Sequence, residues 1–454
     1  MSRHHHHHHT VSPVNPNAQQ TTKAVMNWLA HLPNRTENRV LSGAFGGYSH
    51  DTFSMAEADR IRSATGQSPA IYGCDYARGW LETANIEDSI DVSCNSDLMS
   101  YWKNDGIPQI SLHLANPAFQ SGHFKTPITN DQYKKILDSS TAEGKRLNTM
   151  LSKIADGLQE LENQGVPVLF RPLHEMNGER FWWGLTSYNQ KDNERISLYK
   201  QLYKKIYHYM TDTRGLDHLI WVYSPDANRD FKTDFYPGAS YVDIVGLDAY
   251  FQDAYSINGY DQLTALNKPF AFTEVGPQTA NGSFDYSLFI NAIKHRYPKT
   301  IYFLAWNDEW SPAVNKGASA LYHDSWTLNK GEIWNGDSLT PIVEELIEGR
   351  GSDGNDLIQG GKGADFIEGG KGNDTIRDNS GHNTFLFSGH FGQDRIIGYQ
   401  PTDRLVFQGA DGSTDLRDHA KAVGADTVLS FGADSVTLVG VGLGGLWSEG
   451  VLIS

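Results

Sequence analysis

The sequence predicts an α/β part, a (β/α)8 TIM barrel, followed by a smaller all-β part, a parallel β-roll. Three observations lead to this prediction. Short apolar runs rich in β-branched and aromatic residues alternate with helix-length stretches up to about residue 348. Glycine and aspartate then become abundant, and a nine-residue motif repeats there. We expect residues 11–348 to form the barrel and residues 349–454 the roll, with a secretion-type β region at its end.

Composition narrows the possible partners. Residues 1–10, MSRHHHHHHT, are an expression tag, so their histidines are not a metal site. The net charge of −16 argues against nucleic acid and anionic membranes as partners. The sequence has no run of about 18 apolar residues, so we expect no membrane insertion. No N-terminal secretory signal is recognisable. We also expect the protein to be a monomer.

The chain has two cysteines, Cys74 and Cys94. They can form one disulfide or remain two buried free thiols. Their spacing does not decide between the two, and we favour free thiols.

Eight strand candidates support the barrel. They are residues 39–46, 69–76, 107–114, 166–173, 218–224, 243–249, 269–274 and 300–306. Helix-length patterns such as 129–165 and 194–212 lie between most of them, which predicts a parallel sheet. Eight such units favour a closed barrel over a doubly wound open sheet, for which the sequence has no Gly-rich phosphate loop. The stretch PIVEELIEGR, residues 341–350, predicts a final helix leading into the second part.

Polar and aromatic residues follow most of these strands. In such a barrel, the C-terminal strand ends form the active site. The residues at these ends are Asp75, His113, His174, Glu175, Asp226, Asp248, Tyr250, Glu274 and Trp306. Each of these residues alone can be explained as a solvated loop residue. So many polar and aromatic residues on one rim of the barrel, however, predict a functional site.

Two of these residues predict the chemistry. Glu175 and Glu274 follow the fourth and seventh strands, so they can face each other across a groove and flank a glycosidic bond. Tryptophan and tyrosine rings stack on the apolar faces of sugars. The sequence lacks a Cys/His zinc pattern and a nucleotide loop, so we predict carbohydrate hydrolysis without a catalytic cofactor.

The same segments resemble a known family. RPLHEMNGERFWWG, residues 171–184, resembles the acid/base signature of glycoside hydrolase family 26, best known for endo-β-1,4-mannanases. FTEVG, residues 272–276, resembles the nucleophile motif of that family, and SLHLANP, WVYSPDAN, VGLDAY and FLAWND are similar to its other segments, in the same order. The resemblance covers residues 24–348. It implies a retaining double displacement with Glu175 as general acid and base and Glu274 as nucleophile.

The resemblance also implies substrate-binding roles. His174 would orient the acid/base and contact the sugar, and Tyr250 would hydrogen-bond the nucleophile. Trp306 would stack beneath the reacting sugar, and His113 would line the groove. The further substrate-binding candidates are Asp75, Asp226, Trp182 and Trp183. For the two tryptophans, packing in the barrel rim is an equal alternative.

Arg180 departs from the family pattern, in which its position usually holds an aromatic residue. An arginine there can bind a carboxylate or pyruvate group of an acidic sugar, or it can pair with Glu179 or Asp308. The substrate therefore stays open among mannan, mixed-linkage β-glucan, β-xylan and a bacterial exopolysaccharide. The alternative from another functional class is a non-catalytic polysaccharide-binding protein or adhesin. The presence of both Glu175 and Glu274 argues against it, because such a protein would need neither of them.

The tail contains three consecutive nine-residue units, GSDGNDLIQ, GGKGADFIE and GGKGNDTIR, followed by the degenerate DNSGHNTFL. They match the G-G-x-G-x-D-x-U-x repeat of the RTX calcium β-roll. The U positions would fill a narrow core, and they are Ile358, Ile367, Ile376 and Phe385. A disordered linker would not keep an apolar residue at every ninth position. The predicted calcium-site residues are Asp353, Asp356, Gly360, Lys362, Asp365, Gly369, Lys371, Asp374 and Asn383.

The spacing places each calcium ion between turns two repeats apart. Asp356 would pair with the loop of Asp374, and Asp365 with the loop near Asn383. RTX tails resemble substrates of the type I secretion machinery, which reads a C-terminal signal. The resemblance therefore implies an extracellular, secreted protein whose roll folds when it meets external calcium.

Overall fold

The computed structural model describes residues 10–333, 348–360, 366–378, 383–409, 412, 415–446 and 451–453. The chain divides into two compact units. One unit contains residues 13–22 and 39–331, and the other contains the described residues among 1–12, 23–38 and 332–454. The border predicted at residues 348 and 349 stays a prediction, because residues 334–347 lie outside the described part of the chain.

The first unit is a closed parallel barrel, which confirms the predicted fold class. Its eight strands are β2 Gly43–Tyr48, β3 Ile71–Asp75, β4 Ile107–Ser111, β5 Val168–Arg171, β6 Leu219–Tyr223, β7 Ile244–Phe251, β8 Phe270–Pro277 and β9 Thr300–Ala305. Each strand pairs with the next, and β9 pairs with both β8 and β2, which closes the barrel. The short strands β1 Val40–Leu41 and β10 Thr327–Leu328 continue the sheet beside β9. Each strand overlaps one of the eight predicted ranges.

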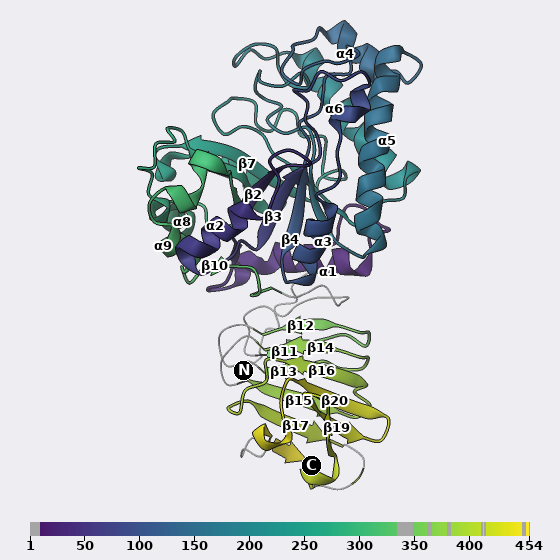
Figure 1. Cartoon of the computed structure of the whole chain (residues 1–454), viewed down its shortest axis with the longest axis vertical. Helices are drawn as coiled ribbons and strands as arrows, with labels where there is room; N and C mark the ends of the chain where they lie inside the picture. Colours follow the sequence, from purple (N-terminus) through teal and green to yellow (C-terminus); the bar gives the residue numbers. More distant parts are fainter. Residues whose placement is uncertain are drawn as a thin grey trace. The chain divides into compact units, whose positions relative to one another are not determined.

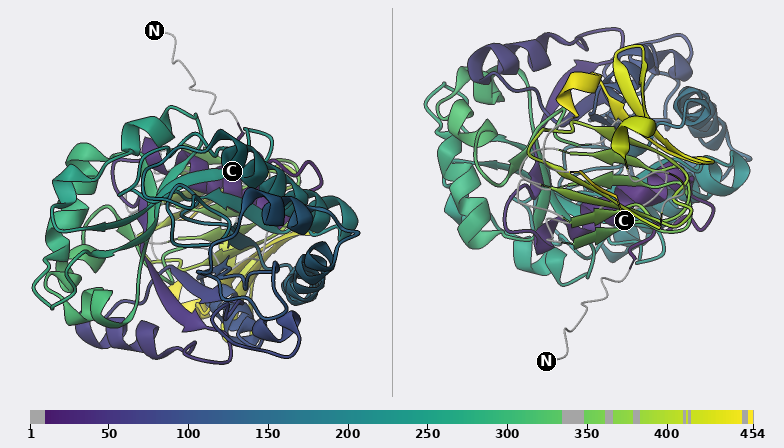
Figure 2. Two further views of the ribbon diagram at one scale, coloured as in Figure 1. Left: turned by 90° about the horizontal axis from the view of Figure 1, so that it is seen from above. Right: turned by 90° about the horizontal axis from the view of Figure 1, so that it is seen from below.

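Helices surround the barrel strands, as the blue, teal and green ribbons at the perimeter of Figure 2 show. They are α2 Ala56–Thr65, α3 Asn95–Lys103, α4 Asn130–Leu137, α5 Ala142–Asn163, α6 Asn193–His208, α7 Tyr260–Thr264, α8 Tyr286–Arg296 and α9 Ala318–Tyr322. The predicted stretch 129–165 divides into α4 and α5 because Thr129 and Thr141 each cap a helix N-terminus with a side-chain oxygen. One further helix, α1, spans Gln20–His31.

The barrel core consists of the strands and the inner faces of these helices. Every residue of β3, β4, β5 and β6 is buried, as expected for parallel strands that are covered on both faces. A disulfide joins Cys74 in β3 to Cys94 at the start of α3. The preference for two free thiols was therefore wrong, because the return of the chain into α3 brings the two Cα atoms within 6.8 Å.

The second unit contains a β-roll with two sheets, drawn in light green and yellow in Figure 1. One sheet contains β11 Glu348–Arg350, β13 Phe366–Glu368, β15 Thr384–Ser388, β17 Arg404–Gln408 and β21 Val451–Ile453, all parallel. The other contains β12 Leu357–Gln359, β14 Thr375–Arg377, β16 Gln393–Ile397 and β20 Asp434–Val439, followed by antiparallel β19 Asp426–Phe431 and β18 Ala420–Val423.

Successive repeats alternate between the two sheets, so residues 18 apart lie side by side. Ile358 pairs with Ile376, and Ile367 pairs with Phe385. All four side chains are fully buried, which confirms that the U positions form the core. Of the predicted final helix, residues 341–347 lie outside the described residues. Residues 348–350 form β11 instead, so that part of the prediction was wrong.

Within the described residues, we find no helix that is long and apolar enough to cross a membrane.

Candidate active site

A pocket of about 580 Å³ opens at the C-terminal ends of the barrel strands. Its lining residues are Tyr48, His113, Phe124, Lys125, Glu175, Arg180, Phe181, Asp226, Asn228, Arg229, Tyr250, Glu274, Gln278, Trp306 and Trp310. Seven of the residues selected from the sequence are among them, including both glutamates. The strand ends thus bring together side chains that are as far apart in the chain as Tyr48 and Trp310.

Glu175 enters the pocket from a strained turn that follows β5. Leu173 and Glu175 have positive φ values of 55° and 56°, a conformation that costs about 1–3 kcal/mol per residue. Three hydrogen bonds hold this turn. The Glu175 N–H donates to the carbonyl of Ser224 at 2.9 Å. The Tyr199 hydroxyl donates to the carbonyl of Leu173 and the Trp183 indole to that of His174, both at 2.8 Å.

Trp182 and Trp183 pack behind this turn. Both are buried, and the Trp182 indole donates to the carbonyl of Leu114 at 3.0 Å. Neither lines the pocket. The structure therefore gives them the packing role that the sequence left as an alternative, and it does not support substrate binding, because their polar atoms and ring faces are already used inside the protein.

Glu175 has the electrostatic setting of a general acid. Burial, followed by repulsion from Glu274 and Asp226, raises the pKa of Glu175 to about 7. The side chain also shares a hydrogen bond with Asp248. Burial raises the pKa of Asp248 as well, against the lowering effect of Arg171. A carboxyl group with a pKa near neutrality can hold a proton at working pH and release it to a leaving group.

Glu274 has a different environment. The Tyr250 hydroxyl donates to its Oε1 at 2.6 Å, and Arg171 Nη2 donates to its Oε2 at 2.9 Å. Arg171 is fully buried and also donates to Asp248 Oδ2 at 2.8 Å. These donors stabilise negative charge on Glu274, which suits a nucleophile.

The functional carboxylates lie close together. One oxygen each of Glu175, Asp248 and Glu274 and one ring nitrogen of His174 all lie within 4.8 Å of one another. Strand pairing contributes to this, because Asp248 in β7 lies opposite Glu274 in β8 beside an irregularity in the register. The buried guanidinium of Arg171 offsets part of the negative charge that collects here.

A further series of hydrogen bonds connects Asp75, His113 and His174. Asp75 is fully buried, and its Oδ2 accepts from Ser111 at 2.8 Å and from His113 Nδ1 at 2.6 Å. His113 Nε2 lies 3.3 Å from His174 Nε2. When His113 donates from Nδ1 to Asp75 and carries no second proton, its Nε2 accepts and His174 donates. Burial, followed by Arg171, lowers the pKa of His174 well below its usual value.

These contacts change two predicted roles. Asp75 and His174 are fully buried and do not line the pocket, whereas His113 does. Asp75 thus orients His113, and direct contact of Asp75 with sugar stays a prediction. His174 supports both His113 and the turn that carries Glu175.

Arg180 has a partner that the sequence did not indicate. Its Nη1 lies 3.7 Å from Glu175 Oε1, and its side chain is 53% exposed. Glu179 instead pairs with Arg229, through two contacts of 2.9 Å. Among the alternatives that the sequence left open for Arg180, the structure therefore describes neither the pair with Glu179 nor the pair with Asp308, but a contact with Glu175.

Aromatic side chains form one wall of the pocket. Trp306 stacks on Phe45 with ring centroids 3.7 Å apart and planes within 4°. The ring centroid of Tyr48 lies 5.3 Å from that of His113 and 4.6 Å from that of Trp80. Sequence reasoning did not select Tyr48 or Phe124. Tyr48 had a usable signal, because it is an aromatic residue at the end of the first predicted strand.

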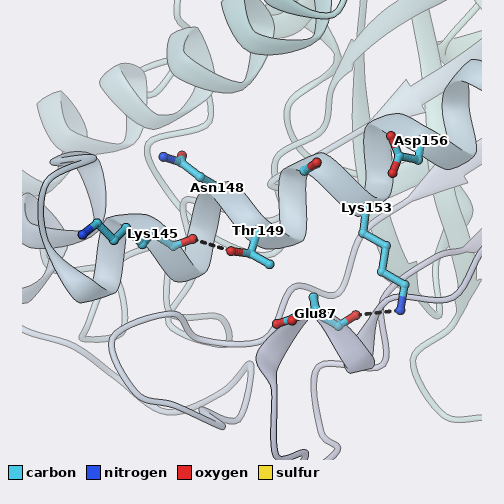
Figure 3. A pocket seen from close by; sticks show the side chains of 7 residues that line it. Glu87, Lys145, Asn148, Thr149, Lys153 and Asp156 are labelled. Atoms are coloured by element: carbon cyan, nitrogen blue, oxygen red, sulfur yellow. Dashed lines mark hydrogen bonds between the residues drawn. The ribbon is translucent and has the colours of Figure 1, made fainter.

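A second pocket, of about 620 Å³, lies along α5 and the short helix η2, Ile86–Ser89 (Figure 3). Its lining residues are Glu87, Lys145, Asn148, Thr149, Ser152, Lys153 and Asp156. Lys153 Nζ donates to the carbonyl of Glu87 at 3.1 Å. The lining contains neither an aromatic ring nor a buried acid, so it lacks the two features of the pocket at the strand ends.

The turns of the roll collect another group of carboxylates. The N–H of Asp356 donates to Asp374 Oδ1 at 2.8 Å, so these two turns lie side by side. Burial, followed by the neighbouring Asp394 and Asp356, raises the pKa of Asp374 to about 9. Of the described residues, none donates to the buried Asp374 Oδ2. An uncompensated buried carboxylate of this kind fits a hard divalent cation such as Ca²⁺. The predicted ligands Lys362 and Asp365 lie outside the described residues.

Comparison with known proteins identifies the barrel. The model of Glycosyl hydrolase family 26 matches residues 14–332. The chain belongs to glycoside hydrolase family 26. The RTX calcium-binding nonapeptide repeat matches residues 350–385 of the same family 26 enzyme.

Relatives of this family 26 enzyme include a mannan endo-1,4-beta-mannosidase of Bacillus subtilis (strain 168), 97% identical over 335 residues, 74% of this chain and 92% of the relative. The mannan endo-1,4-beta-mannosidase A and B of Caldalkalibacillus mannanilyticus is 51% identical over 72% of this chain and 64% of the relative. The solved structure of Bacillus subtilis mannanase BCman shares 98% identity and a TM-score of 0.73, covering 74% of this chain and all of that one. A Pseudomonas fluorescens lipase is 87% identical over 70 residues, 15% of each chain.

Proposed function

We propose that the enzyme is a secreted, retaining endo-β-1,4-mannanase. The observation that carries this proposal is the pair of Glu175 and Glu274, whose oxygens lie within 4.8 Å of each other. Retaining glycosidases separate their carboxyl groups by about 5–5.5 Å, whereas inverting enzymes need about 6.5–9.5 Å to admit a water molecule. The substrate follows from the relatives, which carry the name mannan endo-1,4-beta-mannosidase at 97% and 75% identity.

The mechanism assigns one step to each carboxyl group. Glu274 attacks the anomeric carbon while protonated Glu175 donates its proton to the departing glycosidic oxygen. A water molecule then attacks the glycosyl ester, and ionised Glu175 takes its proton. Arg171 and Tyr250 hold Glu274 in line, and Trp306 offers a face to the reacting sugar.

Product analysis tests this proposal. We expect release of reducing ends from glucomannan in a polysaccharide panel, with oligosaccharides as first products. Freshly released products should carry the β-anomer, observed by proton NMR before mutarotation. Release of the α-anomer would contradict the retaining mechanism, and monosaccharide as the first product would contradict endo action.

An acidic polysaccharide is the alternative substrate that one observation favours. Lys125, Arg180 and Arg229 bring three cations to the pocket lining, and Arg180 is half exposed beside Glu175. These groups could bind carboxylates of an exopolysaccharide. If Arg180→Trp increases hydrolysis of mannan while the unchanged enzyme prefers an acidic polymer, this alternative replaces mannan.

For the roll, we propose that its repeats bind structural Ca²⁺ and that the type I secretion machinery exports the chain. Asp356 and Asp374 would hold the ion that lies between their adjacent turns. Calcium there would neutralise carboxylates that otherwise repel each other, so binding and folding of the roll would be coupled. Circular dichroism tests the first statement, because the roll should become ordered only with calcium. Export from cells that carry type I secretion machinery tests the second.

A further inference from the structure

Tyr188 is the most exposed large apolar side chain in the part of the chain that the structure describes. It is 61% exposed, and Val423 follows at 51%. A single exposed ring is ordinary on a protein surface. The position of this ring is not ordinary, because the side chain beneath it, Arg229, also lines the active-site pocket.

The guanidinium of Arg229 lies against one face of the Tyr188 ring. Its Cζ is 4.6 Å from the ring centroid, a distance at which a planar cation attracts the face of an aromatic ring. Glu179 accepts two hydrogen bonds of 2.9 Å from this guanidinium, and the carbonyl of Asn228 accepts a third at 3.0 Å. Tyr188 therefore rests on a group that other residues already hold in place.

Hydrogen bonds between two loops fix the backbone on which Tyr188 lies. The next residue, Asn189, has a positive φ of 47°, and its Oδ1 accepts from the N–H of Asp230 at 3.0 Å. The buried Asn177 donates through Nδ2 to the carbonyls of Asp226 at 2.9 Å and Asp230 at 3.0 Å. The loops that follow β5 and β6 are thereby joined, and a ring that is already ordered loses little entropy when it binds a ligand.

The chemistry of the pocket indicates which part of a substrate reaches this ring. In the proposed mechanism, the sugar that Glu274 attacks lies on Trp306, and Glu175 protonates the oxygen between that sugar and the departing chain. Arg180 lies 3.7 Å from Glu175, and it lines the pocket together with Arg229. The loops after β5 and β6 therefore continue from the general acid, on the side of the departing chain.

We propose that the exposed face of Tyr188 binds a sugar unit of the departing chain, as an outer subsite on the leaving-group side. This inference rests on the proposed endo-mannanase function and deepens it. The apolar C–H face of a β-linked hexose stacks on an aromatic ring. Glu179 neutralises Arg229, and both side chains are partly exposed, so the platform offers hydrogen bonds without net charge and suits a neutral sugar.

Kinetics of the full chain on two kinds of substrate test the subsite. Tyr188→Ala should lower kcat/KM on the polymer by roughly fivefold to tenfold, because the departing chain loses its stacking partner. On a dinitrophenyl oligosaccharide of the same sugar, kcat/KM should stay within about twofold, since the aryl leaving group does not reach the ring. Tyr188→Phe keeps the ring and should match the unchanged enzyme on both substrates.

Tyr241 provides a matched control. Its ring also faces a cation, with Lys204 Nζ 5.3 Å from the ring centroid. Tyr241 precedes β7, however, and so lies at the N-terminal end of the barrel strands, away from the pocket. Tyr241→Ala should therefore keep kcat/KM on both substrates.

The outcomes separate this subsite from the proposed function. Unchanged hydrolysis of the polymer by Tyr188→Ala would overturn the subsite. An equal loss on the polymer and on the aryl substrate would also overturn it, because the ring would then support the catalytic centre through Arg229. If the unchanged enzyme hydrolyses another polysaccharide and not mannan, the proposed substrate fails. The same comparison, made on that polysaccharide and its aryl oligosaccharide, then still decides whether Tyr188 forms a subsite.

Discussion

The barrel and the roll both bury carboxylates, but they compensate the charge in different ways. In the barrel, Arg171 lies between Asp248 and Glu274 and donates to both at 2.8 and 2.9 Å. In the roll, Asp374 and Asp394 have no cationic partner among the described residues, and burial raises the pKa of Asp394 to about 8. The barrel therefore carries its counter-charge within its own sequence, whereas we expect the roll to take its counter-charge from an ion of its surroundings.

This difference indicates how the barrel and the roll should each respond when dissolved calcium is removed. Because Arg171 compensates the barrel carboxylates from within the protein, we expect the barrel site not to depend on dissolved metal. The nine-residue repeats of the roll bury a narrow core of apolar side chains, which offers little to offset the ordering entropy of their turns. We therefore expect chemistry to depend on individual residues of the barrel, and order in the roll to depend on calcium.

The largest expected effect is on the barrel chemistry. Glu274→Ala removes the nucleophile and should lower kcat on every substrate by about 10⁴-fold or more. Glu175→Ala should lose about 10²–10⁴-fold on polysaccharide but keep the first step on a dinitrophenyl glycoside, whose leaving group needs no proton. Steady-state and burst kinetics measure both. Glu309→Ala, an exposed acid near the same rim, is the control. Equal losses for both glutamates on the activated substrate would refute the assigned roles.

The second effect concerns the internal counter-charge. Arg171→Met should destabilise the barrel by about 3–5 kcal/mol, because it leaves Asp248 and Glu274 buried without their partner. Denaturant unfolding, followed by tryptophan fluorescence, measures this change. Lys134→Met, which removes only exposed pairs with Glu194 and Asp131, should change stability far less. Similar stability of the two variants would show that the barrel does not depend on Arg171 for charge compensation.

The third effect separates the two parts directly. Chelation of calcium should remove the ordered β signal of the roll while hydrolysis changes by less than about twofold, since the barrel has its own core. Circular dichroism and reducing-end release are recorded in parallel during a chelator titration. A roll that stays ordered without metal, or activity that disappears before the roll disorders, would contradict the comparison.

The smallest effect is on the pH profile. Productive Glu175 carries a proton, so activity should fall as pH rises through its pKa of about 7. Arg180 favours the ionised form, and its removal should raise that pKa. Because Arg180 is half exposed, we expect Arg180→Met to move the alkaline limb of kcat/KM upwards by only roughly 0.2–0.7 pH unit. Arg180→Lys should largely keep the original limb. A limb that moves to lower pH would refute this electrostatic role.

Much of this arrangement followed from sequence alone. The alternation of apolar runs and helix-length patterns determined the eight barrel strands, because parallel strands covered on both faces must be continuously apolar. The nine-residue period determined the roll, because every U position has to enter the same narrow core. The polar strand ends then identified Glu175 and Glu274, since barrel topology gathers those ends on one rim.

Only the tertiary structure decided which polar residues meet, because such contacts join strands far apart in the chain. Arg171 looked like one charge among several after the fourth strand, yet it bridges Asp248 and Glu274. For Trp182 and Trp183 the sequence left sugar binding and packing equally open, and the turn after β5 directs both side chains inward. Cys74 and Cys94 became a disulfide only through the path of the chain into α3. Sequence periodicity reports burial along one element, whereas charge compensation depends on distances between elements, which the fold alone determines.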